Sequence, residues 1–157
     1  MAVSILNHRK LLIVDDEPDI LTTLEGEILE SCTGCKIDKA TNYESAAELL
    51  KSKEYDLVVL DIMGVRGFDL LEIAVAEKFK VVMLTANAMN PKALMKAHDM
   101  GAMAYLPKDK MGEIVPFLED ALQYEHKSAW KRLMEKLEEY YTDKFESTDW
   151  KNKHTWY

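Results

Sequence analysis

The stretch Leu57–Asp61, which reads LVVLD, decides the fold class of this chain. Its aliphatic run ends abruptly at a carboxylate. Such a short, continuous run is typical of a strand buried on both faces of a parallel sheet that helices cover. Two similar runs, Leu11–Val14 and Val81–Leu84, end at Asp15 and Thr85. The three runs together predict an α/β fold.

Weaker strands are predicted at Lys36–Ala40 and Ala104–Leu106, with helices in the gaps. The helices are predicted after Pro18, after Thr41, around Phe68–Val75, from Asn90-Pro91 to Gly101, and from about Glu113. Asn90 is predicted as the cap of the fourth helix and Pro91 as its first residue. Thr41 and Glu44 have the spacing of a capping box. Because strand and helix alternate five times, we expect a doubly wound, five-stranded parallel sheet with right-handed crossovers.

The composition narrows the class of protein. A hydrophobic content of 48% can supply a core, and a net charge of −8 disfavours nucleic acid or an anionic membrane as the main partner. No apolar run approaches the ~20 residues that span a bilayer, and no signal-peptide pattern is visible. Two cysteines are too few for a disulfide framework, which agrees with a reducing compartment. We therefore expect a cytoplasmic protein without membrane insertion.

Polar side chains follow the predicted strands where each strand ends. Asp15 and Asp16 follow the first strand, Asp61 the third, Thr85 the fourth and Lys108 the fifth. Any one of them alone is more often a turn, a cap or a solvated residue. In open α/β sheets, however, ligands bind at the carboxyl ends of the strands, so we expect all five side chains to converge on one site.

This set of residues suits phosphoryl transfer. Three carboxylates in one pocket repel each other, and Mg²⁺ is a hard cation that such oxygens bind. Lys108 supplies a positive charge and Thr85 a hydroxyl donor for the oxygens of a phosphoryl group. Asp61 is the best nucleophile because it stands alone after the central strand, whereas Asp15 and Asp16 form a metal-binding pair.

Four separated segments carry a family resemblance: Leu12–Glu17, Leu57–Met63, Leu84–Ala86 and Ala104–Lys108. Over roughly residues 9–124 the chain resembles the response-regulator receiver family (CheY-like). The resemblance implies a flavodoxin-like (βα)5 fold with strand order 2-1-3-4-5. It also implies that Asp61 accepts phosphate from a sensor histidine kinase or a phosphotransfer protein.

The resemblance implies further roles for individual residues. Asp16, Asp61 and the backbone carbonyl of Met63 would ligate Mg²⁺ directly, and Asp15 would act largely through a water. Thr85 would bind a phosphoryl oxygen, and Lys108 would pair with the phosphate. Thr85 and Tyr105 would form the switch that shifts a two-state equilibrium on phosphorylation.

Two segments depart from the family pattern. In the family, the loop after the aspartate usually has a proline at the position of Val65 and a glycine two residues beyond Gly67, so this loop is short. The family's lysine usually precedes a proline in a cis peptide bond, whereas Asp109 follows Lys108 here. A cis bond before a residue other than proline costs ~3–4 kcal/mol, so this turn is predicted to be rebuilt.

Residues 125–157 are predicted as a C-terminal helical extension to a receiver domain of residues 1–124. Trp130, Leu133, Leu137, Tyr141 and Phe145 form a stripe at helical spacing. One interpretation is a helix that folds against its own domain, and the other is a helix that forms a homodimer. The segment lacks the basic patch of a DNA-binding domain.

Two other patterns are interpreted as structural or incidental. Cys32 and Cys35 form a C-x-x-C that follows a helix, whereas redox pairs usually sit at a helix N-terminus. The four histidines show no metal-ligand or catalytic spacing.

The sequence thus predicts a phosphoacceptor response regulator that signals by protein–protein contact and is not an enzyme beyond self-phosphorylation and self-dephosphorylation. One alternative is a degenerate receiver that binds partners without phosphorylation, which the short loop after Asp61 motivates. A phosphohydrolase with an aspartyl nucleophile is a second alternative. That chemistry generally needs a second acid where this chain has Met63.

Overall fold

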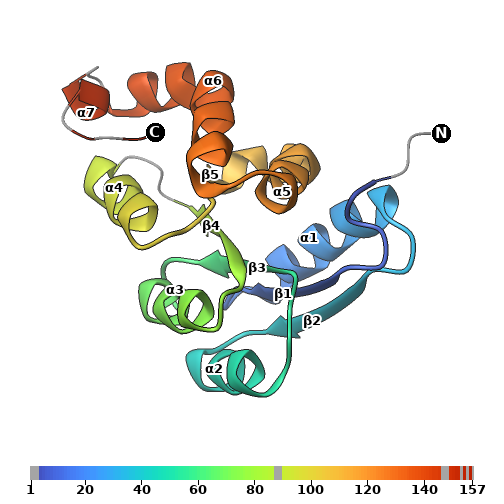
Figure 1. Ribbon diagram of the computed structural model, residues 1–157. Helices are drawn as coiled ribbons and strands as arrows, with labels where there is room; N and C mark the ends of the chain where they lie inside the picture. Colours follow the sequence, from blue (N-terminus) through green and yellow to red (C-terminus); the bar gives the residue numbers. More distant parts are fainter. Residues whose placement is uncertain (1–3, 87–89, 146–148, 153, 155, 157) are drawn as a thin grey trace.

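The sheet has five parallel strands in the order β2-β1-β3-β4-β5, as predicted (Figure 1). The computed structural model describes residues 4–86, 90–145, 149–152, 154 and 156. The strands are β1 (Lys10–Val14), β2 (Lys36–Ala40), β3 (Leu57–Asp61), β4 (Lys80–Thr85) and β5 (Ala104–Pro107). Strand β3 is buried along its whole length, which explains its uninterrupted aliphatic run.

Helices connect the strands and cover both faces of the sheet. They are α1 (Pro18–Ser31), α2 (Tyr43–Ser52), α3 (Gly67–Ala76), α4 (Pro91–Asp99) and α5 (Ile114–Gln123). Helices α1 and α5 lie on one face, and α2, α3 and α4 on the other (Figure 1). The fold is therefore flavodoxin-like, and the carboxyl ends of all five strands meet at one edge.

The helix starts follow local side-chain chemistry. As predicted, Asn90 caps α4, because its Oδ1 accepts hydrogen bonds from the backbone N–H groups of Lys92 and Ala93. The capping box predicted at Thr41 was wrong. Asn42 caps α2 instead, and its Oδ1 accepts from the Ser45 N–H at 2.9 Å. Asparagine is at least as good a cap as threonine, and it lies one residue nearer the helix.

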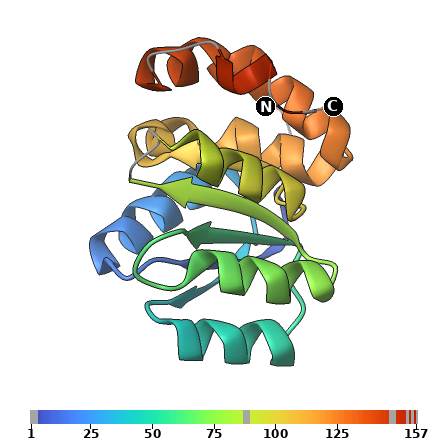
Figure 2. The same cartoon turned by 90° about the vertical axis from the view of Figure 1, so that its left-hand side faces the viewer.

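The C-terminal extension folds back over its own domain. Helix α6 (His126–Phe145) contacts α5 and β5, and α7 (Asp149–Asn152) follows it. Figure 2 shows these helices as a further layer beyond α4 and α5. The stripe residues Trp130, Leu133, Leu137 and Tyr141 are almost completely buried. Of the two interpretations of the stripe, the structure therefore has the fold-back arrangement.

Hydrogen bonds to the backbone hold α6 in place. Trp130 Nε1 donates to the Ala102 carbonyl at 2.7 Å, and the Tyr141 hydroxyl donates to the Tyr105 carbonyl. Strand β5 is at the edge of the sheet, so α6 covers an edge that would otherwise be open to other chains. The homodimer hypothesis assumed that the stripe is exposed, and this assumption is not met.

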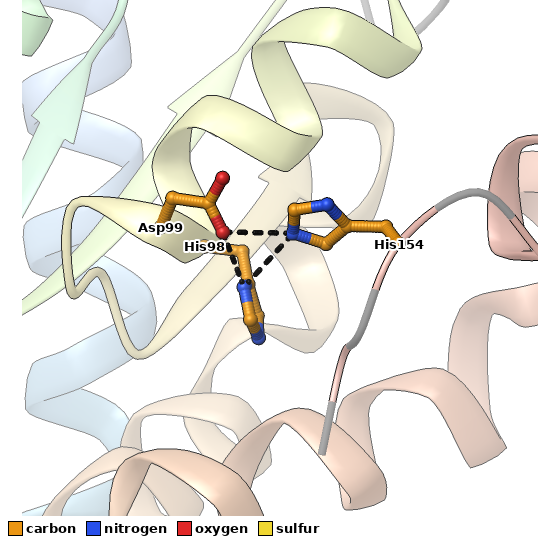
Figure 3. A group of neighbouring side chains, drawn as sticks. All are labelled: His98, Asp99 and His154. Carbon is orange, nitrogen blue, oxygen red and sulfur yellow. Dashed lines mark hydrogen bonds and ion pairs between the residues drawn. The ribbon is translucent and has the colours of Figure 1, made fainter.

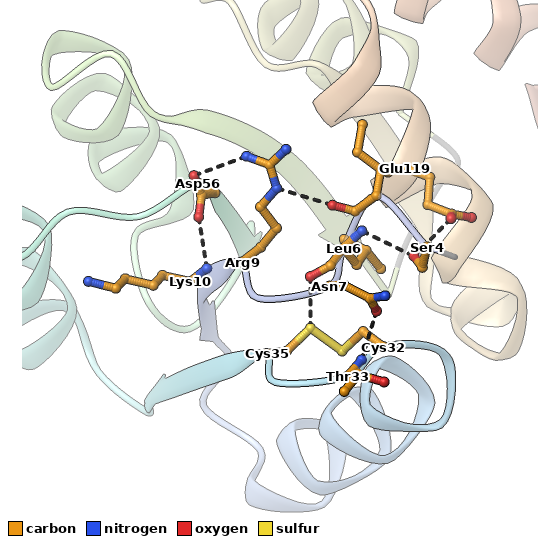
Figure 4. Close-up of a disulfide and its surroundings, with 11 residues drawn as sticks. Ser4, Leu6, Asn7, Arg9, Lys10, Cys32, Thr33, Cys35, Asp56 and Glu119 are labelled. Carbon is orange, nitrogen blue, oxygen red and sulfur yellow. Dashed lines mark hydrogen bonds and ion pairs between the residues drawn. A yellow bond between two sulfur atoms is a disulfide. The ribbon is translucent and has the colours of Figure 1, made fainter. Parts of the chain in front are cut away.

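Cys32 and Cys35 are joined by a disulfide in the loop between α1 and β2 (Figure 4). The bond closes a very short loop, so it adds little constraint to the unfolded chain. The structural or incidental role of the C-x-x-C stays a prediction. None of the helices in the described part of the chain has the length and apolar character of a membrane span.

Candidate functional site

Three carboxylates meet at the carboxyl edge of the sheet. Asp15 follows β1 and Asp61 ends β3, which are neighbouring strands, and Asp16 comes next along the chain. One carboxylate oxygen of each residue lies within 4.8 Å of the others. Asp15 and Asp61 are buried, whereas Asp16 is exposed. The predicted convergence of these acids is therefore present in the structure.

The Lys108 ammonium joins this group from the end of β5. Its Nζ lies 2.8 Å from Asp15 Oδ2 and 3.6 Å from Asp61 Oδ1. Burial lowers the pKa of Lys108, but the hydrogen bond to Asp15 and the charge of Asp61 outweigh this effect, and the pKa is raised overall. Lys108 is therefore a permanent positive charge between two buried acids.

Asp61 resists ionisation more than an ordinary aspartate. Burial, and next the charge of Asp15, raise the pKa of Asp61 to about 6. The charge of Lys108 opposes this shift, and that of Asp16 adds to it. A divalent cation would relieve the repulsion among the three acids, so the donor set fits a hard ion such as Mg²⁺.

Thr85 and Tyr105 lie on the two neighbouring strands β4 and β5. Thr85 is buried and follows Leu84, the residue that pairs with Asp61 across the sheet. Tyr105 is completely buried, and burial raises the pKa of its phenol to about 12, with a smaller opposing effect of the Thr85 side chain. The two predicted switch residues are thus brought together.

Tyr141 of α6 covers Tyr105, a contact that sequence reasoning missed. The two rings lie 6.2 Å apart between centroids. The stripe along α6 was the available signal, but it could not say which residue of the domain each stripe member would contact. Tyr105 is therefore enclosed in part by a residue of the C-terminal helix.

The loop after Asp61 is tight, as its short length predicts. The Gly67 N–H donates to the Ile62 carbonyl at 3.0 Å and closes the turn. A side chain at Gly64, which has φ +82°, would collide with the Asp16 carboxylate. Met63 is exposed at the tip of this loop. The short loop is therefore possible because glycines occupy two of its positions.

The turn after Lys108 is also rebuilt. Residues Lys108–Glu113 form a 3₁₀ helix, η1, that leads into α5. No cis peptide bond occurs among the described residues. The chain thus presents Lys108 to the acids without the proline of the family pattern.

Comparison with known proteins identifies the class. Residues 11–118 match the response regulator receiver domain family, and the chain belongs to this family. The sensory transduction protein LytR of Staphylococcus haemolyticus is 38% identical over 101 residues, which are 63% of this chain and 39% of that protein. The chain thus spans less than half of the length of this curated relative.

Solved structures share the fold. A response regulator from Burkholderia pseudomallei, solved with a phosphorylated aspartic acid, a calcium ion and citrate, matches with a TM-score of 0.69 at 21% identity, covering 83% of this chain and 74% of that one. A two-component response regulator from Clostridium difficile matches with a TM-score of 0.57 at 29% identity, covering 64% of this chain and 83% of that one.

Proposed function

We propose that this chain is a phosphoacceptor response regulator in which Asp61 receives a phosphoryl group from a sensor histidine kinase or a phosphotransfer protein. The observation that carries the proposal is the position of the Lys108 ammonium, 2.8 Å from Asp15 and 3.6 Å from Asp61 at the carboxyl edge of the sheet. A partly buried cation beside a buried carboxylate is suited to neutralise the charge of an incoming phosphoryl group.

The transfer follows from the chemistry of the residues present. An Asp61 carboxylate oxygen attacks the phosphorus in line, and the bond from phosphorus to the donor breaks as the aspartyl phosphate forms. Asp61 must be ionised to attack, and a pKa of about 6 leaves it largely ionised at neutral pH. Lys108 offsets charge on the phosphoryl oxygens, and Thr85 donates its hydroxyl to one of them.

The same residues would hold Mg²⁺. Asp16, Asp61 and the backbone carbonyl of Met63 are the proposed direct ligands, and Asp15 acts through a water. Three carboxylates within 4.8 Å of one another and the raised pKa of Asp61 support this assignment. When bound, Mg²⁺ supplies positive charge to the phosphoryl oxygens in the transition state. The Burkholderia relative, with its phosphorylated aspartic acid and calcium ion, offers a parallel.

The signal is proposed to leave through protein–protein contact. Thr85 and Tyr105 are the proposed switch, and Tyr141 of α6 packs on Tyr105. A change at Tyr105 would therefore be transmitted to α6, which lies on the surface of α5 and β5. In this role the chain acts in the cytoplasm and turns over only its own aspartyl phosphate. Because the stripe of α6 is buried, a homodimer would have to use other faces of the C-terminal helix, and it stays a prediction.

A degenerate receiver that binds partners without phosphorylation is the second candidate. The short loop after Asp61 motivates it, because this loop borders the site and a side chain at Gly64 would collide with the Asp16 carboxylate. In this case the buried acids and Lys108 would be a structural ion-pair network.

The test is an intact-mass measurement of the full chain incubated with acetyl phosphate and Mg²⁺. Wild type and Asp19→Asn should each gain the mass of one phosphoryl group, and Asp61→Asn should gain none. Asp19 is a matched control because it is an exposed carboxylate at the start of α1, near the same edge of the sheet. An unlabelled wild type would favour the degenerate receiver, and labelled Asp61→Asn would remove Asp61 from its proposed role.

A further inference from the structure

A second group of potential metal ligands lies at the junction between α4 and the C-terminal segment (Figure 3). His98 and Asp99 end α4, and His154 follows α7. His98 Nδ1 lies 3.3 Å from His154 Nε2, Asp99 Oδ1 lies 3.2 Å from His98 Nδ1, and His154 Nε2 lies 2.8 Å from Asp99 Oδ1. The sequence spacing of the histidines gave no sign of this group, because the fold-back of the chain brings two of them together with an acid.

The hydrogen bond on the other side of the His98 ring fixes its tautomer. His98 Nε2 lies 2.7 Å from the Trp156 carbonyl oxygen, which can only accept, so Nε2 carries the proton. A neutral His98 then has its lone pair on Nδ1, which faces Asp99 and His154. Metal-binding histidines commonly make such a bond with their second nitrogen, because it orients the ring and raises the basicity of the ligating nitrogen.

The spacing of the three atoms suits a tetrahedral cation. Zinc bonds of about 2.0–2.1 Å place tetrahedral donors about 3.3 Å apart. The three observed separations run from 2.8 to 3.3 Å. Two imidazoles and one carboxylate also form a donor set that zinc-like ions accept and Mg²⁺ does not prefer.

We propose that His98 Nδ1, Asp99 Oδ1 and His154 Nε2 form a binding site for Zn²⁺ or a similar divalent transition metal. The site is separate from the acidic pocket: α4 begins after the carboxyl end of β4 and ends before the amino end of β5, so the two lie at opposite edges of the sheet. A bound ion would cross-link α4 to the C-terminal segment and hold the extension against the domain.

The surroundings keep the His98 ring in place. The ring is buried, with its centroid 4.8 Å from that of Trp130 and 5.1 Å from that of Trp156. His126 is near, but its Nε2 lies 3.0 Å from the His98 carbonyl oxygen and is used in that hydrogen bond. His126 is therefore a neighbour that supports the site from outside the ligand set.

The alternative is a hydrogen-bonded cluster without a metal. A proton on His154 Nε2 can be donated to Asp99 Oδ1 at 2.8 Å, which would satisfy these two residues. Only the metal site predicts stoichiometric, histidine-dependent zinc binding.

The experiment is a zinc titration of the full, untagged chain, with the disulfide intact and Mg²⁺ in excess, followed by calorimetry. We expect one equivalent of Zn²⁺ to bind wild type. His154→Gln and Asp99→Asn should each weaken binding by at least about 10-fold, because loss of a direct ligand costs no less than loss of an outer-sphere partner. Asp61→Asn should bind zinc like wild type, which separates this site from the proposed phosphoacceptor pocket.

The controls address folding and unspecific binding. His8→Gln is the matched control, since His8 is an exposed histidine in the segment before β1, and it should bind zinc like wild type. Asp99 is largely exposed, so Asp99→Asn should keep the wild-type far-ultraviolet circular dichroism, and the same measurement checks the folding of His154→Gln. Co²⁺ should give the strong visible absorption of a tetrahedral site in wild type and lose it in His154→Gln. No zinc binding by wild type, or equal binding by His154→Gln, would overturn the proposal.

Discussion

The acidic pocket around Asp61 and the histidine cluster at His98 are built in different ways. The pocket takes its residues from strand ends that the sheet topology brings together, and three carboxylates face one ammonium. The cluster joins the end of α4 to a residue after α7 and has two imidazoles and one carboxylate. A site at the strand ends of a parallel sheet can be predicted from the sequence, because its residues directly follow recognisable strands. A site that a folded-back terminus completes cannot be predicted in this way, because its residues share no sequence pattern.

The first prediction tests the fold-back that the histidine cluster depends on. Trp130→Ala should lower the free energy of unfolding by about 3–5 kcal/mol, because a completely buried indole leaves a large cavity. Chemical denaturation measures the loss, and hydrogen exchange should show that α6 becomes less protected.

Leu29→Ala is the control for this prediction, since Leu29 is a half-exposed leucine on α1 and its removal should cost less than about 1 kcal/mol. Equal effects of the two substitutions would mean that α6 is not docked on the domain in solution. The histidine cluster, which depends on this docking, would then not form.

The second prediction concerns the ammonium of the acidic pocket. Lys108→Met should slow phosphorylation by acetyl phosphate by about 10²–10³-fold, because it removes the cation that faces the transferring group. The time course of intact mass measures the rate. Lys110→Met, two residues on and paired with Glu113, should leave the rate near that of wild type. A similar rate for Lys108→Met would show that the pocket does not need its cation.

The third prediction uses the titration of Asp61. Its pKa of about 6 lies above the unfolded value of about 3.9, so the folded chain binds this proton more tightly and loses stability as pH rises through about 6. In chelator and at about pH 8, Asp61→Asn should therefore raise the free energy of unfolding by on the order of 2 kcal/mol.

The increase in the free energy of unfolding caused by Asp61→Asn should shrink as pH falls from about 6. It should be small near pH 4, where folded Asp61 is protonated. Urea denaturation at several pH values measures it, with Asp19→Asn as the control. A pH-independent gain would contradict the assigned cause, the burial of a charge beside Asp15.

The smallest expected effect belongs to the contact between α6 and the switch residue. Tyr141→Phe should cost about 0.5–1.5 kcal/mol, because it leaves the buried Tyr105 carbonyl without the hydroxyl that donates to it. Tyr140→Phe is the neighbouring control, since its hydroxyl bonds to the exposed Asp109 and should contribute less. Equal costs would place the two hydroxyls in similar, solvated surroundings.

The features that could be predicted from the sequence are those that depend on local residue patterns or on the topology of the sheet. The strand order followed from the family resemblance, and the meeting of Asp15, Asp61 and Lys108 followed from where the predicted strands end. The cap at Asn90 followed from the Asn-Pro pair that precedes the helix. The cap at Asn42 was missed because two neighbouring residues could both cap, and only backbone geometry decides between them.

Contacts between helices that are distant in the sequence could not be predicted from its patterns. The stripe on α6 fits a partner helix and its own domain equally well, so burial of Trp130 could not be predicted. His98 and His154 are 56 residues apart and no periodic pattern connects them, so their approach depends wholly on how α6 packs.

The most direct test of the central claim is to locate the phosphoryl group on the chain. After incubation with acetyl phosphate and Mg²⁺, borohydride reduces an aspartyl phosphate to a stable homoserine, which peptide mass spectrometry assigns to one residue. We predict homoserine at position 61 and none at 15 or 16. Label at Asp15, the acid nearer to Lys108, or no label on the folded chain, would contradict the assignment of Asp61 as the phosphoacceptor.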